Sequence, residues 1–211
     1  MKHILSITII CLLLTSCKEE KKEKNSVPTL KSSIKYAKGF DIVTDGIQKK
    51  LIIKKPYQNA KHEFTFLLGD KTDLKKNLLK VPVENIVVTS TTHIPMLEQI
   101  GAEQFLTGFP QTKFISSEKT RKRIDNGNII ELGNEQTINT ERLIELSPDL
   151  VVAFGLDGSN KAYKTILRNN ISVIYNGDWL EETPLGRAEW IKFFGVLFNK
   201  EKKADSIFKF I

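Results

Sequence analysis

Short apolar runs alternate with amphipathic stretches through the middle of this chain. The run Ile86–Val88 is too brief for a helix and consists of β-branched residues, which predicts a buried strand. After five polar residues, 89–93, apolar residues recur at helical spacing: Ile94, Leu97 and Ile100. Gly101 is placed to end that helix, and a second strand is expected at 105–107. The pattern therefore predicts one β-α-β unit with a polar loop after its first strand.

The same rhythm continues beyond Pro110. Three further strands are predicted, at 129–132, 149–154 and 172–175. Two helices are expected between them, at 140–146 and 161–168, and Asn139 is suited to cap the first. Such crossover units give parallel strands, so three polar loops should gather at one edge of the sheet: 89–93, 155–158 and 176–179. Alternating strands and helices of this kind predict an α/β fold. In open α/β sheets, ligands bind at the edge where these loops lie.

The segments on either side of this region have patterns of their own. Residues 33–80 predict an antiparallel β preface, with strands at 40–43, 49–54 and 64–68 and a lysine-rich connector at 70–80. Residues 184–199 predict an amphipathic helix with four inward side chains: Trp190, Phe194, Leu197 and Phe198. Asn199 ends that helix, and residues 200–211 begin another with one apolar face: Ala204, Ile207, Phe208 and Ile211.

The first residues have the pattern of an export signal. A basic start precedes an apolar run, 4–14, that is well below the ~20 residues needed to span a bilayer. Leu-Thr-Ser before Cys17 resembles a bacterial lipobox, so 1–16 is expected to be a lipoprotein signal peptide and Cys17 the lipid-bearing first residue of the mature chain. The alternative is an ordinary signal peptide with an incidental cysteine. Residues 17–32 would then be a charged tether, and the protein would be exported and lipid-anchored on the periplasmic side or the cell surface.

Charge and cysteine usage narrow the function classes. The formal net charge is +7, and removing Lys2 with the signal leaves +6. The lysines are scattered and no basic stripe with interleaved aromatic residues is present, so we do not expect nucleic-acid binding. The tight basic cluster 119–123 is interpreted as a solvated helix face rather than an anion site. Cys11 would leave with the signal and Cys17 would be blocked by lipid, so no disulfide is expected.

Candidate ligand-binding residues lie in the three polar loops: Ser90, Thr91, Thr92, His93, Phe154, Gly155, Asp178 and Trp179. Their hydroxyls and aromatic rings suit a bulky chelate, and at least one of the threonines is expected to cap the helix that follows. His93 and Met96 form an alternative pair of haem axial ligands. A bare metal site is not expected, because the mature chain has only His62 and His93. Arg187 and Glu189 are assigned to the C-terminal amphipathic helix.

Four segments, taken in order, carry a family resemblance: IVVTSTTHIPMLEQIGAEQFLTGFP, IIELGNEQTINTERLIELSPDLVVAF, ISVIYNGDW and PLGRAEWIKFFGVLFNKEKKADSIF. Together they resemble the class III substrate-binding proteins of ABC importers, which bind siderophores, haem and cobalamin. The Cys-Lys-Glu-Glu start of the mature chain also resembles the surface-export tags of some Bacteroidetes lipoproteins.

The resemblance implies two α/β lobes joined by one long helix, with the ligand held between them. By this comparison, 81–183 is the N-terminal lobe of the class III periplasmic-binding-protein fold, 184–199 a flanking helix and 200–211 the start of the lobe-joining helix. Glu141, in the Asn-Thr-Glu motif, would pair with arginines of the permease; the alternative role is complementarity with the helix dipole. The protein would act as a monomer with permease and ATPase subunits, carrying a ferric siderophore, haem or cobalamin and using no cofactor of its own.

Because the segment that resembles the lobe-joining helix stands at the end of the sequence, we expect a truncated form that lacks the second lobe. One alternative is a surface or periplasmic lipoprotein that uses its single lobe as an interaction module. A hydrolase is the other alternative on an α/β frame, and the lack of a Gly-x-Ser-x-Gly nucleophile elbow argues against it. We therefore expect a binding protein rather than an enzyme.

Overall fold

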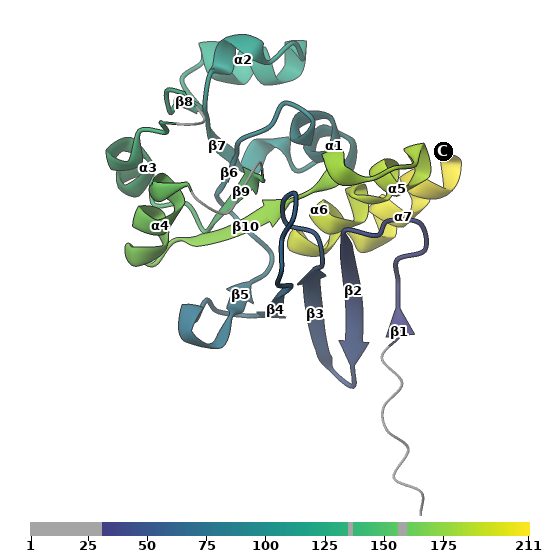
Figure 1. Cartoon of the computed structure of the whole chain (residues 1–211). Coiled ribbons are helices and arrows are strands. Elements are labelled where there is room, and N and C mark those ends of the chain that lie inside the picture. The colour runs from purple at the N-terminus through teal and green to yellow at the C-terminus, as the bar shows by residue number, and fades with distance from the viewer. Residues whose placement is uncertain (1–30, 135–136, 156–159) are drawn as a thin grey trace, which may run out of the picture.

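A computed structural model describes residues 31–134, 137–155 and 160–211. It contains two five-stranded sheets that share one apolar core (Figure 1). The predicted signal peptide 1–16, Cys17 and most of the predicted tether lie outside the described residues, as do residues 156–158 of the second polar loop. Among the residues described, no helix has the length and apolar character needed to cross a bilayer.

One sheet is entirely parallel and contains the predicted β-α-β rhythm. Its strands are β6 (Ile86–Val88), β7 (Leu106–Phe109), β8 (Ile130–Glu131), β9 (Leu150–Phe154) and β10 (Ser172–Asn176). They lie in the order β10-β9-β6-β7-β8. The central strand β6 is buried on both faces: Ile86 and Val88 belong to one apolar cluster and Val87 to another. Residues that alternate between two buried faces explain why this strand is apolar throughout.

Helices cover both faces of the parallel sheet (Figure 1). The first cluster includes buried side chains of α1 (His93–Ile100) and α6 (Ile191–Leu197), and the second includes those of α3 (Thr140–Leu146) and α4 (Lys161–Arg168). The predicted end of α1 is confirmed, because Gly101 adopts a left-handed φ of 68°. Asn139 also caps α3 as predicted, its side chain accepting a hydrogen bond from the Arg142 N–H at 3.0 Å.

The second sheet is the predicted β preface with two additional strands. Its order is β1 (Lys31–Ser32), β2 (Phe40–Asp45), β3 (Gln48–Ile53), β4 (Phe64–Gly69) and β5 (Leu78–Lys80). The three predicted strands pair antiparallel as expected, and at one edge the additional strand β5 pairs parallel to β4. The predicted connector contains a short 3-10 helix, η2 (Leu74–Lys76), which returns the chain so that β5 can run alongside β4. Leu79, only 1% exposed, anchors β5 in the core despite its lysine-rich surroundings.

The predicted C-terminal helix is divided in two at Trp190. Helix α5 (Pro184–Glu189) precedes that residue and α6 follows it. The Trp190 side chain is fully buried, with its ring centroid 4.4 Å from that of Phe40, so the preface sheet packs directly on this junction. Thr183 caps α5 by accepting a hydrogen bond from the Gly186 N–H, and proline occupies the first turn as expected.

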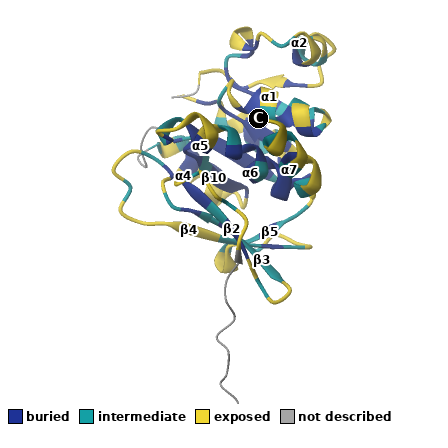
Figure 2. Ribbon diagram, turned by 90° about the vertical axis from the view of Figure 1, so that its right-hand side faces the viewer, coloured by how far each residue is buried: buried dark blue, intermediate teal, exposed yellow. Residues whose placement is uncertain are grey.

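The last helix, α7 (Glu201–Phe210), packs on α6 through Ala204. Asn199, with φ of 53°, ends the preceding helical segment as predicted. Of the four apolar residues at helical spacing, Ala204 is buried, Ile207 and Phe208 pack against the core, and Ile211 is 64% exposed. Figure 2 shows the exposed outer side of α7 beside the buried centre of the molecule.

The basic cluster 119–123 lies on α2 (Glu118–Asp125) and is more closely bound than predicted. The Arg121 guanidinium donates to the Thr112 carbonyl, and that of Arg123 donates to the carbonyls of Gln104 and Leu106. Lys119 pairs with Glu103 of a 3-10 turn, η3 (Glu103–Phe105). These side chains therefore hold α2 to the loop that surrounds β7. Lys119 is exposed, as the interpretation as a solvated face predicts, whereas Arg121 and Arg123 are only partly exposed.

Two buried carboxylates hold the backbone of residues 35–39, a segment that we call the backbone anchor. Glu189 accepts hydrogen bonds from three consecutive N–H groups, at 35–37, and from the Lys192 ammonium at 3.0 Å. Glu181 accepts from the next two N–H groups, at 38–39, and from the Trp190 indole. Five successive backbone donors are thereby satisfied by side chains of the C-terminal region, which places Glu189 in α5 as predicted but gives it a structural role that the sequence did not indicate.

Candidate functional site

The polar loops after β6, β9 and β10 meet at the carboxyl edge of the parallel sheet, as predicted. The Thr92 hydroxyl donates to the Asp178 carboxylate across 3.1 Å, which joins the first loop to the third. The Trp179 indole donates to the Gly155 carbonyl at 3.1 Å, and the Phe154 N–H donates to the Thr89 hydroxyl at 2.8 Å. The described parts of all three loops are therefore linked by hydrogen bonds.

A cavity of about 220 Å³ opens at this edge. One side is formed by residues that follow β6 and end β9: Thr89, Ser90, Thr91 and Phe154. The other side is formed at and after the end of β7, leading into the 3-10 helix η4 (Thr112–Phe114): Phe109, Pro110, Gln111 and Phe114. The predicted ligand residues Ser90, Thr91 and Phe154 thus line one cavity, while the β7 side was missed. The sequence pattern predicts a strand that ends at residue 107, whereas β7 ends at Phe109, so the pattern does not place the residues around Phe109 at the edge of the sheet.

None of the eight cavity-lining side chains is ionisable. Phe109 is 2% exposed and lies deep in the site, whereas Phe114 is 59% exposed. The Phe154 ring packs against Trp179, with 5.7 Å between ring centroids. Aromatic faces combined with hydroxyl and amide groups suit a ligand that offers an uncharged ring face together with a few hydrogen-bonding groups.

Residues 54–57, which we call the strap, cover the neighbouring part of the same edge. A Cβ atom on Gly155 would lie 2.0 Å from the Pro56 carbonyl oxygen, and one on Gly177 would lie 2.2 Å from that of Lys55. The preface chain therefore crosses the carboxyl ends of β9 and β10 at a distance that only glycine allows. This contact explains why the predicted ligand residue Gly155 does not line the cavity, and why the predicted site is narrower than three open loops would give.

The predicted capping role of a threonine in the first loop is wrong. Thr92 stands before α1 with a helical φ of −66°, and its side chain caps no backbone N–H. Its hydroxyl contacts Asp178 and Ser90 instead. Ser90 takes part of the capping role, because its hydroxyl accepts from the Thr92 N–H at 3.3 Å and its carbonyl accepts from the His93 N–H.

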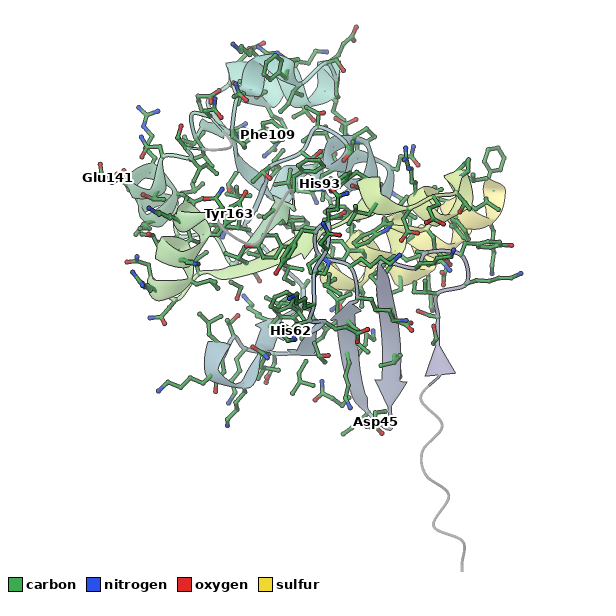
Figure 3. All side chains as sticks on the ribbon, in the orientation of Figure 1. Asp45, His62, His93, Phe109, Glu141 and Tyr163 are labelled. Carbon is green, nitrogen blue, oxygen red and sulfur yellow. The ribbon has the colours of Figure 1, made fainter. Side chains whose placement is uncertain are left out.

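His93 is a core residue and not a ligand-facing one, which corrects its predicted role. Its side chain is fully buried, with the ring centroid 5.5 Å from that of Phe194, and burial lowers the pKa of the imidazole to about 3. Met96 packs against the same core, so the alternative of haem ligation by this pair is wrong. Figure 3 shows His93 in the interior and His62, which is exposed, separately at the preface. In the part of the chain that the structure describes, no three potential metal ligands gather.

Asp178 and Trp179 lie behind the cavity wall. Asp178 is 5% exposed, and this burial raises the pKa of its carboxyl group despite the hydrogen bonds from Thr92 and the Trp179 N–H. Trp179 backs the Phe154 ring. The fluorescence of Trp179 should therefore respond to a ligand that contacts Phe154. Asp178 is connected to the cavity through Thr92.

Glu141 is exposed in the first turn of α3, as predicted, at the outer margin of the molecule (Figure 3). Within the described residues its carboxylate forms no hydrogen bond or ion pair. An unpaired carboxylate at this position is complementary to the helix dipole and remains available to an external cation.

Comparison with known proteins assigns the fold to a family. Residues 86–211, more than half of the chain, match the family described as periplasmic binding protein. The chain belongs to this family. The predicted α/β class and the class III periplasmic-binding fold are confirmed, and the family is one of solute-binding proteins.

Relatives of this periplasmic binding protein include two proteins of Methanocaldococcus jannaschii. One is an uncharacterized lipoprotein, 26% identical, covering 99% of this chain and 60% of its own length. The other is an uncharacterized protein, 33% identical over 39% of this chain and 25% of its own length. The chain therefore spans 60% or less of the length of these curated relatives.

Two solved structures share the fold. A periplasmic binding protein from Veillonella parvula is 14% identical, with a TM-score of 0.54 over 85% of this chain and 52% of that one. The siderophore-binding protein BauB, solved with two acinetobactin molecules and ferric iron, is 19% identical, with a TM-score of 0.51 over 69% of this chain and 46% of that one. At these identities the likeness concerns the fold.

Proposed function

We propose that this periplasmic binding protein is the substrate-binding lipoprotein of an ABC importer. It captures an iron chelate (a siderophore or haem) or cobalamin and delivers it to the permease. The observation that carries the proposal is the cavity of about 220 Å³ at the carboxyl edge of the sheet. All eight of its lining residues, the aromatic walls included, come from the segment between residues 86 and 211 that matches the family.

The cavity is smaller than a whole chelate, so a ligand of that class would be held partly outside it. Drug-sized ligands occupy pockets of roughly 300–1,000 Å³, so this cavity has room for one ring or arm of a chelate. Phe109, Phe114 and Phe154 supply stacking surfaces, and Ser90 and Thr91 supply hydrogen bonds. A haem would be held through its faces, since His93 is buried and cannot act as an axial ligand.

Placement in the cell envelope is part of the same proposal. The lipobox-like sequence before Cys17 supports export and lipid anchoring, on the periplasmic side or at the cell surface. The 26%-identical relative that spans 99% of this chain is named a lipoprotein, which supports the same assignment. The partners would be the permease and ATPase subunits of the importer, and the binding protein itself would act as a monomer.

Fluorescence titration tests ligand capture. The protein is titrated with ferric acinetobactin, haemin and cyanocobalamin. One of the three should quench the fluorescence of Trp179 at micromolar concentration, because the Trp179 ring backs the Phe154 wall. Phe154→Ala should weaken that binding about tenfold, which corresponds to the loss of one stacked ring. Phe64→Ala, which removes a partly exposed ring on the preface, is the matched control and should leave affinity unchanged. Absence of binding to all three ligands, checked by calorimetry, would count against the proposal.

A second experiment tests docking to the permease. Glu141→Ala should reduce binding to the importer in detergent or nanodiscs about threefold to tenfold, because an exposed ion pair with a permease arginine would be lost. Ligand affinity should stay the same. Glu118→Ala, which removes an exposed first-turn carboxylate from α2, is the control and should have no effect on either measurement. A change in ligand affinity with Glu141→Ala would show that the docking role is wrong.

A further inference from the structure

Three side chains connect the cavity to a buried carboxylate. The Ser90 and Thr92 hydroxyl oxygens are 2.9 Å apart, and the Thr92 hydroxyl is 3.1 Å from Asp178 Oδ2. Of the three, Ser90 lines the cavity, whereas Asp178 is 5% exposed and is reached through Thr92. Within the described residues, the carboxylate is connected to the cavity lining through the two hydroxyls.

Counting protons fixes the direction of this chain of hydrogen bonds. The ionised carboxylate of Asp178 only accepts, so in that form the single hydroxyl proton of Thr92 is donated to Asp178. The oxygen of Thr92 must then accept the contact with Ser90, and the hydroxyl proton of Ser90 is directed to Thr92. Ser90 also accepts from the Thr92 N–H, which leaves one of its two lone pairs available. Ser90 thus presents an acceptor to the cavity and no donor.

We infer that Asp178, acting through Thr92, is a positioning residue that makes Ser90 a hydrogen-bond acceptor for the ligand. The inference rests on the proposed function and adds to it a class of ligand group. The part of the chelate that enters this cavity carries an N–H or O–H donor, such as an amide or a hydroxyl, beside an uncharged ring face. A carboxylate or carbonyl oxygen placed against Ser90 would meet its lone pair and would be disfavoured at that position.

This polarity agrees with the other cavity walls. The lining contains no lysine, arginine or histidine to pair with an anionic arm. Its three phenylalanines favour a flat, uncharged face. Aspartate, threonine and serine therefore select the hydrogen-bonding group, while the aromatic residues select the shape that surrounds it.

A double-mutant cycle tests the relay with whichever of ferric acinetobactin, haemin and cyanocobalamin binds the full chain. Thr92→Val and Asp178→Asn should each weaken binding about threefold to tenfold, since a typical net hydrogen bond is lost or misdirected. In a Ser90→Ala background, both substitutions should have no further effect. In a Thr91→Val background, where the altered hydroxyl is a neighbour outside the relay, the effects should multiply. Loss of affinity that is the same with and without Ser90 would overturn the inference and assign Asp178 a structural role.

Neutron diffraction tests the relay without any ligand. In crystals of the full chain exchanged into D₂O, the Thr92 deuteron should lie between Thr92 Oγ1 and Asp178 Oδ2. The Ser90 deuteron should lie between the two hydroxyl oxygens. A Ser90 deuteron directed into the cavity would overturn the inference. If the relay is seen but none of the three ligands binds, the proposed function fails and the polarity of Ser90 stands.

Discussion

Glu189→Ala is expected to lower the free energy of unfolding by about 3–5 kcal/mol, the range seen when one partner of a buried charged pair is removed. The side chain is fully buried, and it accepts from the backbone anchor and from Lys192. Its loss leaves three backbone N–H groups without their acceptor, while the Lys192 ammonium keeps the Ser33 carbonyl and Asp205 as partners. Urea unfolding followed by circular dichroism measures the change directly.

Two comparisons separate this effect from a general loss of charge. Glu182→Ala removes a neighbouring carboxylate whose ion pair with Lys38 is exposed, and it should change stability by no more than about 0.5 kcal/mol. Glu189→Gln keeps the shape of the side chain, and its loss of unfolding free energy should lie between those of the two alanine variants. Equal stability of Glu189→Ala and Glu182→Ala would show that the anchor contributes nothing.

The same carboxylate gives stability a defined pH dependence. Burial alone would raise the pKa of Glu189, but hydrogen bonds from the N–H groups of Ala37, Tyr36 and Lys35 and from Lys192 outweigh it, and the pKa lies below the ordinary 4.5. A lowered pKa means that the stabilisation is complete above pH 4.5 and is lost as the pH falls through the folded-state value. The difference in stability between the wild type and Glu189→Ala should therefore shrink in acid.

Gly155→Ala should destabilise the protein by about 2–3 kcal/mol, in the upper part of the range for overpacking. The new Cβ would stand 2.0 Å from the Pro56 carbonyl oxygen, and backbone on both sides would have to separate. Gly69→Ala is the matched control: its Cβ would meet only the flexible end of Leu78 at 2.9 Å, so a small side-chain adjustment suffices. If both variants melt at the wild-type temperature, the strap does not cross β9 as closely as described.

Elements whose cause is local could be predicted from the sequence. The buried strand β6, the helix that Gly101 ends and the cap at Asn139 follow from residues within a few positions of each other. Parallel order then followed from the crossover pattern, which is why the loops were correctly expected at one edge.

Features that depend on distant packing could not be predicted. The helix is divided at Trp190, where Phe40, 150 positions earlier, packs against the indole, and no periodicity records that contact. His93 is polar in sequence but is enclosed by α6. Only part of the candidate site could be predicted. The β6 and β9 walls of the cavity follow from the ends of those strands, whereas the exclusion of Gly155 from the cavity depends on the strap, which belongs to the preface.

The backbone anchor also has a consequence for the order of folding. Glu189 contacts Lys35 across 154 positions, and Glu181 contacts Lys38 across 143. During synthesis, residues 35–39 are made early and find their acceptors only after nearly the whole described chain has emerged. Contacts of such long range slow folding, because a large loop must close before they form. The preface sheet is therefore first in the chain and among the last parts to be locked in place.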